Sequence, residues 1–233
     1  MSGYVDVIVG CGGSGGWVAA MLMKSPGRAP VVLVDGDAIE RRNLERQLFS
    51  MRDVGHNKAQ ALAARMRVQG MEVEAFAEYL REGCEAWTSL VKRDETLRVY
   101  CCPDNHPARM ACLKLADERW VEGRKTVVAV AGNEEFTADA SVYLPRWKGT
   151  RDDYRVRYPE TVTATAGDPL HPPCTGEAVA AQPQRALANA IAAMNTVWLM
   201  ELWSERIGCD TDALVVERAP KFITYGRYNL AKE

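Results

Sequence analysis

Residues 7–15, Val-Ile-Val-Gly-Cys-Gly-Gly-Ser-Gly, constrain the fold of this chain more than any other segment. They predict a short apolar strand that runs into a tight turn with the spacing G-x-G-x-x-G, followed by an apolar helix over 17–23. Glycines let the backbone turn sharply and approach a phosphate, and a helix N-terminus offers unpaired N–H groups and the positive end of the dipole. The segment therefore predicts an anion-binding turn. Its glycines are Gly10, Gly12, Gly13 and Gly15.

A second apolar strand is expected at residues 31–34, and it ends in Asp35, 20 residues after Gly15. An acidic residue at this distance binds a ribose hydroxyl in nucleotide-binding βαβ units. A glycine turn that binds no ligand is the alternative. The turn and the acid together favour a nucleotide site.

Composition and charge narrow the class of protein. With 233 residues the chain can form one sizeable α/β domain. Its 29 Lys and Arg against 31 Asp and Glu give a net charge of −2, which provides no general attraction to nucleic acid or to an anionic membrane. No apolar run approaches the ~20 residues that span a bilayer, and the first residues do not read as a secretory signal. We expect a cytoplasmic protein with neither nucleic acid nor a membrane as partner.

The chain contains seven cysteines, and an odd number without a secretory signal indicates reduced thiols. The spacing C-x-x-C is absent from the sequence, so zinc is not expected. Cys11, Cys101 and Cys112 read as small core residues.

Strands and helices alternate along the first half of the chain. Strands are expected at 5–9, 31–34, 72–77, 97–101 and 126–131, and helices at 14–24, 57–68, 85–92 and 108–121. This order predicts a Rossmann-like α/β fold, a mostly parallel twisted sheet with helices on both faces and a ligand at the carboxyl ends of the strands.

The pattern changes after residue 131. Residues 145–176 lack a clear period and predict a long loop, whereas 184–203 predict a helix that is apolar around most of its circumference and buried in the core or at a subunit interface. Two further strands are expected at 213–216 and 221–225. The predicted organisation is a nucleotide-binding core (1–144), a crossover loop (145–181), and a C-terminal helix and strands that complete the same domain (182–233).

The segment 35–61 carries polar and cationic residues just after Asp35. Arg46 and Lys58 can neutralise the negative charge that spreads over a triphosphate during attack at phosphorus. Lys58 is also expected at or near a helix N-terminus, where phosphate is favoured. We interpret Arg41, Arg42 and Arg52 as solvated surface charges. The candidate nucleotide-site residues of this segment are Asn43, Arg46, Gln47 and Lys58.

The fourth expected strand ends in Cys-Cys-Pro-Asp-Asn-His-Pro-Ala-Arg, residues 101–109. Asp104 directly follows the strand end, where its carboxylate can hold Mg²⁺ bound to the phosphates of ATP. Asn105 either caps the next helix or contacts the nucleotide base.

The order GxGGxG, DxD, NLxRQ, GxxKA and a strand ending in DN, over about residues 5–135, resembles the ThiF/MoeB superfamily, adenylyltransferases related to ubiquitin-activating enzymes. The resemblance implies a homodimer that binds MgATP and adenylates a carboxylate, commonly the C-terminal glycine of a ubiquitin-like or sulfur-carrier protein. By this resemblance Asp35 binds the ribose and Asp104 holds Mg²⁺. The residues implied at the phosphates are Asn43, Arg46 and Lys58.

Many members of this family then transfer the acyl group to a cysteine. The family pattern places that thiol at Cys174, in His-Pro-Pro-Cys-Thr-Gly-Glu-Ala, after the crossover loop and shortly before a helix. A nearby positive charge or helix N-terminus lowers the pKa of such a thiol, and His171 is close in sequence. A loop cysteine without a function is the alternative.

The sequence departs from the family pattern in three places, the first of which is the absence of cysteine pairs for zinc. Members of the family carry an arginine-bearing helix before the first strand, whereas this sequence opens on the strand. Cys101 stands where an acidic residue is frequent in the pattern D-x-x-D-N. Other residues then complete the triphosphate site, or the activity is lower, or a partner protein supplies the missing group.

Two other functions remain open from the sequence. An NAD- or flavin-dependent oxidoreductase would use the same glycine turn and Asp35, but it would leave Arg46, Lys58 and Asp104 without a role. A non-catalytic module would bind a nucleotide or a ubiquitin-like partner without any reaction.

Overall fold

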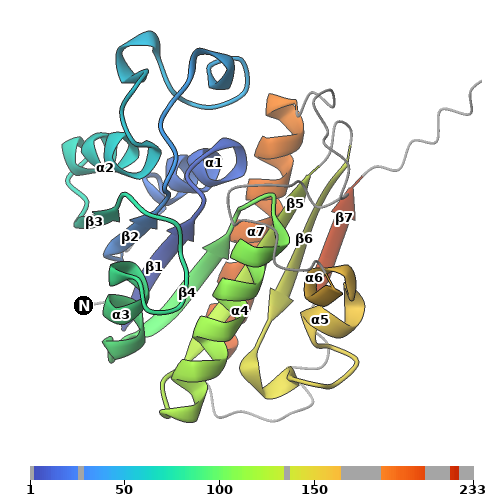
Figure 1. Ribbon diagram of the computed structural model, residues 1–233. Coiled ribbons are helices and arrows are strands. Elements are labelled where there is room, and N and C mark those ends of the chain that lie inside the picture. Colours follow the sequence, from blue (N-terminus) through green and yellow to red (C-terminus); the bar gives the residue numbers. More distant parts are fainter. Residues whose placement is uncertain (1–2, 26–28, 134–136, 164–184, 208–220, 226–233) are drawn as a thin grey trace, which may run out of the picture.

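The computed structural model describes residues 3–25, 29–133, 137–163, 185–207 and 221–225 (Figure 1). Its centre is a seven-stranded sheet in the order β3-β2-β1-β4-β5-β6-β7. The strands from β3 to β5 run parallel, and β6 is antiparallel to both of its neighbours. The predicted Rossmann-like α/β fold is confirmed. The strands are β1 (Tyr4–Val9), β2 (Val31–Val34), β3 (Val73–Phe76), β4 (Thr96–Cys101), β5 (Thr126–Asn133), β6 (Ala138–Tyr143) and β7 (Phe222–Tyr225).

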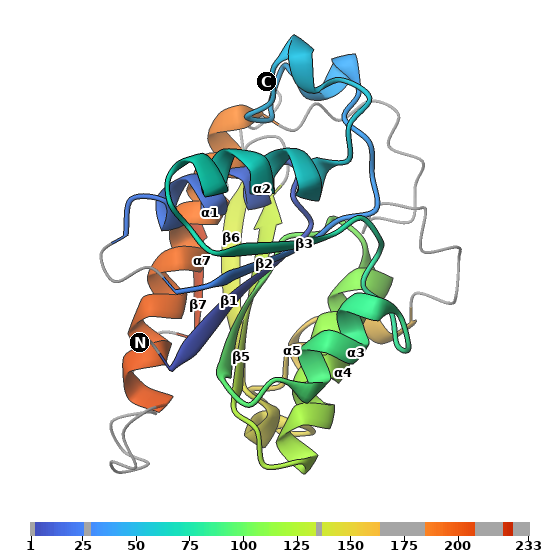
Figure 2. The same cartoon turned by 90° about the vertical axis from the view of Figure 1, so that its left-hand side faces the viewer.

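Helices cover both faces of the sheet, as Figure 2 shows from its edge. α1 (Gly13–Leu22), α2 (Lys58–Val68) and α7 (Ala186–Ile207) pack on one face, and α3 (Glu85–Lys92) and α4 (His106–Val121) on the other. Successive strand side chains point to opposite faces, so Ile8 enters the first core while Val7 and Val9 enter the second. This explains why the parallel strands read as unbroken apolar runs in the sequence.

Strand β6 is a strand that the sequence analysis did not predict. Its first residues, Ala-Asp-Ala-Ser, have low β-propensity and no continuous apolar run. The strand forms because it pairs on both sides, with Ala131 of β5 opposite Ala140 and Ile223 of β7 also opposite Ala140. β5 directly precedes β6 in the chain, whereas β7 lies about 80 residues further on, so the pairing with β7 is a tertiary effect.

Residues 145–163, expected as part of a long loop, instead form short helices: η3 (Pro145–Trp147), α5 (Tyr154–Arg157) and α6 (Glu160–Thr163). The carboxylate of Asp153 caps α5 by accepting the backbone N–H of Arg155 at 3.0 Å. The guanidinium of Arg155 then pairs with Asp117 of α4 at 2.8 Å. These contacts hold in place a segment whose sequence has no regular spacing of apolar residues.

The predicted C-terminal helix is α7, which packs against α1 and strands β4, β5 and β6. Its Trp203 lies edge-on against the ring of Trp147, with the two ring centroids 5.1 Å apart. The strand predicted at 221–225 is β7. Residues 164–184, which include His171 and Cys174, and the strand expected at 213–216 lie outside the described residues.

The side chain of Arg119 on α4 is fully buried and ties α3 to the start of β4. Its guanidinium donates to the carbonyl oxygens of Leu90, Arg93 and Glu95 at 2.6–2.7 Å and to the Thr126 hydroxyl at 2.9 Å. Burial lowers the pKa of Arg119 to about 10, so the group stays protonated at neutral pH. A cation at the C-terminal end of α3 satisfies carbonyls that have no further helical partner.

We expect Arg119→Met to lower the free energy of unfolding by about 3 kcal/mol, because the substitution leaves several buried carbonyl groups without donors. Urea unfolding followed by circular dichroism measures the change. Lys114→Met, on an exposed position of the same helix, is the control and should change stability by less than about 0.5 kcal/mol. Equal stability of the two variants would contradict the role assigned to Arg119.

Candidate functional site

The glycine turn between β1 and α1 has a geometry that only glycine allows at two positions. Gly10 has φ +82°, and a Cβ there would lie 3.0 Å from the backbone nitrogen of Pro103. A Cβ on Gly15 would lie 1.9 Å from the carbonyl oxygen of Gly10. Gly12 occupies the N-cap position of α1 without a capping side chain. The first N–H groups of α1 are thus available to an anion.

Asp35, at the end of β2, lies against this turn. The residue is 7% exposed, and its carboxylate accepts the backbone N–H of Cys11 at 2.6 Å and that of Asp37 at 2.8 Å. Burial raises the pKa of Asp35, and the positive charge of Lys58 opposes that increase. The predicted ribose-binding acid and the predicted phosphate-binding turn are therefore in direct contact.

Lys58 is the first residue of α2, which confirms its predicted place at a helix N-terminus. Its ammonium lies 2.6 Å from a carboxylate oxygen of Asp37, and its side chain is 9% exposed. The other oxygen of Asp37 accepts the hydroxyl of Tyr79, whose ring lies over Gly36. The N-cap residue Asn57 also bonds to the carbonyl of Asp35 at 2.7 Å, which ties the start of α2 to the end of β2.

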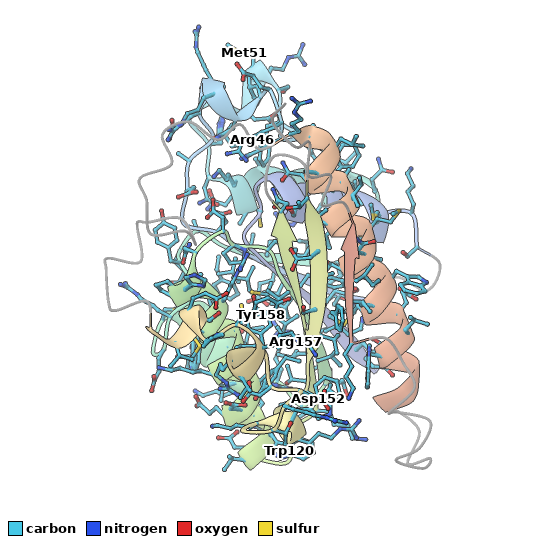
Figure 3. All side chains as sticks on the ribbon, turned by 90° about the vertical axis from the view of Figure 1, so that its right-hand side faces the viewer. Arg46, Met51, Trp120, Asp152, Arg157 and Tyr158 are labelled. Carbon is cyan, nitrogen blue, oxygen red and sulfur yellow. The ribbon has the colours of Figure 1, made fainter. Side chains whose placement is uncertain are left out.

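Arg46 lies between η1 (Arg41–Asn43) and η2 (Met51–Asp53), in a segment that extends past the end of the sheet (Figures 1 and 3). Figure 3 places its side chain near the end of the sheet at which α7 begins. Burial lowers the pKa of Arg46, and the attraction of Asp104 opposes the shift. Arg46 and Asp104, distant in sequence, thus act on each other at this edge.

Three of the predicted site side chains make contacts within the protein itself, apart from any contact with a ligand. The carbonyl oxygen of Asn43 accepts the backbone N–H of Glu40 at 2.9 Å. That of Asn105 accepts the N–H of Ala108 at 2.9 Å, so Asn105 is the N-cap of α4, one of its two predicted roles. Gln47 is buried, and its amide lies against Gly12, 3.3 Å from where a Cβ would be.

Asp35, Gln47 and Pro103, which precedes Asp104, lie against the glycine turn at the edge of the sheet where β1, β2 and β4 end, and Lys58 acts on Asp35. Cys174 lies outside the described residues, so its position relative to this edge is left to experiment. Among the described residues, no group of three or more acidic, histidine or cysteine side chains is arranged so that it could hold a metal ion. Asp104 would accordingly supply one ligand to a cation whose other ligands come from phosphates and water.

Sequence reasoning missed several polar residues at this edge. Asp37 and Tyr79 hold Lys58, and the D-x-D pattern already contained Asp37. Asn189 of α7 and Asn133 of β5 lie next to Gly13 and Ser14. A polar residue such as Asn189 within an apolar helix was the available signal, since buried amides require partners.

This chain belongs to the ThiF family, whose model matches residues 5–206. It is 38% identical over 104 residues to the mouse (Mus musculus) protein named adenylyltransferase and sulfurtransferase MOCS3, covering 44% of this chain and 22% of that protein. It is 31% identical over 143 residues to ubiquitin-like modifier-activating enzyme 5 of Bombyx mori, covering 55% of this chain and 36% of that protein. The chain thus matches only about a fifth to a third of the length of these relatives.

Solved structures share the fold. The microcin C7 biosynthetic enzyme MccB in complex with N-formylated MccA matches with a TM-score of 0.58 at 24% identity, over 86% of this chain and 57% of that one. PaaA matches with a TM-score of 0.56 at 22% identity, over 84% of this chain and 64% of that one. In the described part of the chain, every helix is too short or too polar to span a lipid bilayer.

We predict that Lys58→Met raises the pKa of Asp35 further, because the substitution removes the cation that opposes the effect of burial. Titration of the aspartate carboxyl carbons by NMR measures the shift. Lys92→Met, at an exposed position of α3 on the opposite face of the sheet, should leave Asp35 unchanged. A pKa that stays the same in Lys58→Met would show that Lys58 does not act on Asp35.

Proposed function

We propose that this protein is an adenylyltransferase that activates a carboxylate with MgATP. The observation that carries the proposal is that Asp35 lies against the glycine turn with Lys58 acting on it, in a chain of the ThiF family. Gln47 and Pro103, the chain neighbours of Arg46 and Asp104, also lie against this turn. An oxidoreductase would bind a dinucleotide at the same turn, but it has no need of two cations and an acid around a phosphate tail.

The nucleotide would bind across the carboxyl ends of the strands. Asp35 would accept a ribose hydroxyl, and the open N-terminus of α1 would receive phosphate oxygens. Asn43 and Gln47 are both buried and would contact the nucleotide, Gln47 from its place against Gly12. Asn105 holds the loop that carries Asp104 by capping α4.

In the reaction, a carboxylate oxygen of the substrate attacks the α-phosphorus of ATP. A new phosphorus–oxygen bond forms, the bond to the β-phosphate oxygen breaks, and pyrophosphate leaves with the bonding pair. Lys58 and Arg46 would neutralise the charge that develops on the phosphate oxygens. Asp104 would hold the Mg²⁺ that arrives with ATP and offsets the charge of the leaving pyrophosphate. Because Asp37 already fixes the Lys58 ammonium, little reorganisation is required when the phosphates arrive.

The names of the two curated relatives, one a sulfurtransferase and adenylyltransferase and one an activating enzyme of a ubiquitin-like modifier, support a protein substrate. We propose the C-terminus of a ubiquitin-like or sulfur-carrier protein as the carboxylate, in a cytoplasmic pathway. The protein would act as a homodimer, and the exposed side chains of Leu187, Met194 and Trp198 on one side of α7 supply an apolar surface suited to self-association.

We expect Arg46→Ala to reduce ATP–pyrophosphate exchange by about 10²- to 10³-fold, because the variant loses charge stabilisation in the transition state. The assay uses purified protein with small ubiquitin-like and sulfur-carrier proteins that have free C-termini. Arg52→Ala, an exposed arginine of η2, should retain the exchange rate of the native protein. Nucleotide binding with no exchange in the native protein would identify a non-catalytic binding module instead.

Cys174 is proposed to accept the acyl group as a thioester. Its thiolate would attack the acyl carbon of the adenylate, forming the carbon–sulfur bond and releasing AMP. Incubation with ATP and a carrier protein should yield an adduct that a reductant removes and that Cys174→Ala abolishes, as seen by intact-protein mass spectrometry. Cys84→Ala, a half-buried cysteine ahead of α3, is the control and should leave the adduct intact. An adduct that survives Cys174→Ala would assign the thioester to a different thiol.

A further inference from the structure

Three side chains in contact connect the loop after β3 to the start of α2. The hydroxyl of Tyr79 donates to one carboxylate oxygen of Asp37, and the ammonium of Lys58 lies 2.6 Å from the other oxygen. Asp37 follows β2, whereas Tyr79 follows β3. The two loops lie side by side because β2 and β3 are parallel neighbours, with Val34 opposite Phe76 at their ends.

The structure around Tyr79 holds its side chain in this place. The ring lies directly over Gly36, where a Cβ would come within 2.7 Å of two ring carbons, so a glycine is required beneath it. The preceding residue, Glu78, accepts the backbone N–H of Ala86 at 2.6 Å at the start of α3, and the following residue, Leu80, is buried. The Tyr79 hydroxyl is therefore presented to Asp37 from a loop that is anchored on both sides.

Asp37 is the more exposed partner of its ion pair with Lys58. The side chain of Asp37 is 47% exposed, whereas that of Lys58 is 9% exposed. An exposed ion pair holds a single geometry only weakly, because water competes for the charges and both side chains lose conformational freedom. With a donor at each of its oxygens, the Asp37 carboxylate cannot turn toward water without breaking a hydrogen bond. The hydroxyl of Tyr79 thus fixes the orientation of the group that holds Lys58.

The position of the Lys58 ammonium matters because this cation also acts on the buried Asp35. Asp35 in turn contacts the glycine turn through the backbone N–H of Cys11. If the Asp37 carboxylate turned toward water, the ammonium would follow it, since the two charges attract each other at short range. The cation would then move away from Asp35 and from the turn that is proposed to receive the phosphates.

We infer that Tyr79 is a positioning residue for the adenylation, which keeps the Lys58 ammonium beside the phosphates of ATP by fixing the carboxylate of Asp37. This inference rests on the proposed function. It adds a residue that lies outside the GxGGxG, DxD, NLxRQ, GxxKA and DN segments. In this role Tyr79 does not contact the nucleotide: its ring serves packing over Gly36, and its hydroxyl serves the reaction through Asp37 and Lys58.

Tyr79→Phe tests the inference because the substitution keeps the ring over Gly36 and removes only the hydroxyl. In the free protein, NMR titration of the aspartate carboxyl carbons should show the pKa of Asp35 raised by about 0.5, because the cation that opposes the effect of burial moves away. The change should be smaller than in Lys58→Met, where the cation is lost. Adding Tyr79→Phe to Lys58→Met should raise the pKa of Asp35 no further, because the hydroxyl acts through the cation.

The reaction supplies a second measurement. In ATP–pyrophosphate exchange, Tyr79→Phe should lower kcat by about fivefold and leave the KM for ATP within about twofold of the native value, because Lys58 stabilises charge that develops during the attack. In an Asp37→Ala background, Tyr79→Phe should change kcat by less than about twofold, whereas independent effects of the two substitutions would multiply.

Tyr4→Phe is the matched control, because it also removes a hydroxyl that donates one hydrogen bond. The hydroxyl of Tyr4 donates to the carbonyl oxygen of Ser204 at 3.0 Å, and Tyr4 begins β1, at the end of the strand opposite the glycine turn. This substitution should lower the melting temperature about as much as Tyr79→Phe does, and it should keep the native kcat and the native pKa of Asp35.

The outcomes separate this inference from the proposed function. An unchanged pKa of Asp35 in Tyr79→Phe overturns the inference, and so does a rise that persists in the Lys58→Met background. A native kcat in Tyr79→Phe overturns the role of the hydroxyl in the reaction. If the native protein catalyses no exchange while the titrations give the expected result, the proposed function is overturned and the placement of the cation by Tyr79 stands.

Discussion

The hydrogen bond from the backbone N–H of Cys11 to the carboxylate of Asp35 joins the two parts of the molecule on which the site depends. It links the turn after β1 to the end of the neighbouring strand β2. The turn itself closes only because Gly10 takes a positive φ and Gly15 approaches the Gly10 carbonyl without a side chain. A shift of either strand along the sheet would separate the acid from the turn, so the parallel register of β1 and β2 fixes the nucleotide site.

Around that contact, charged side chains of opposite sign interact with one another. Asp35 is buried and its pKa is raised, and Lys58 limits the increase. Lys58 is in turn held by Asp37, which Tyr79 also contacts. Arg46 and Asp104 form a second pair of opposite charges from loops that follow different strands. Cations that are already positioned before the ligand binds can stabilise developing negative charge without first reorganising, which is the main requirement of phosphoryl chemistry.

The same edge also contains buried polar atoms that have no hydrogen-bond partner among the described residues. The amides of Asn189, Gln47 and Asn133 retain unpaired polar atoms, whereas elsewhere the buried cation Arg119 is saturated with carbonyl acceptors. Buried polar atoms without a partner among the described residues also occur away from this edge, on Thr161 and Asn195.

Much of the fold followed from local patterns. The glycine spacing, the acid 20 residues later and the continuous apolar runs determined the parallel sheet, the ligand edge and the ribose-binding candidate, because these features depend on short segments and on a fixed chain direction. Tertiary structure alone decided the rest. Strand β6 exists through its two partners, Arg155 orders its helix through Asp117, and Asn189 reaches Gly13 from the far end of the chain. No local propensity encodes contacts of this kind, since they arise only when separate elements pack together.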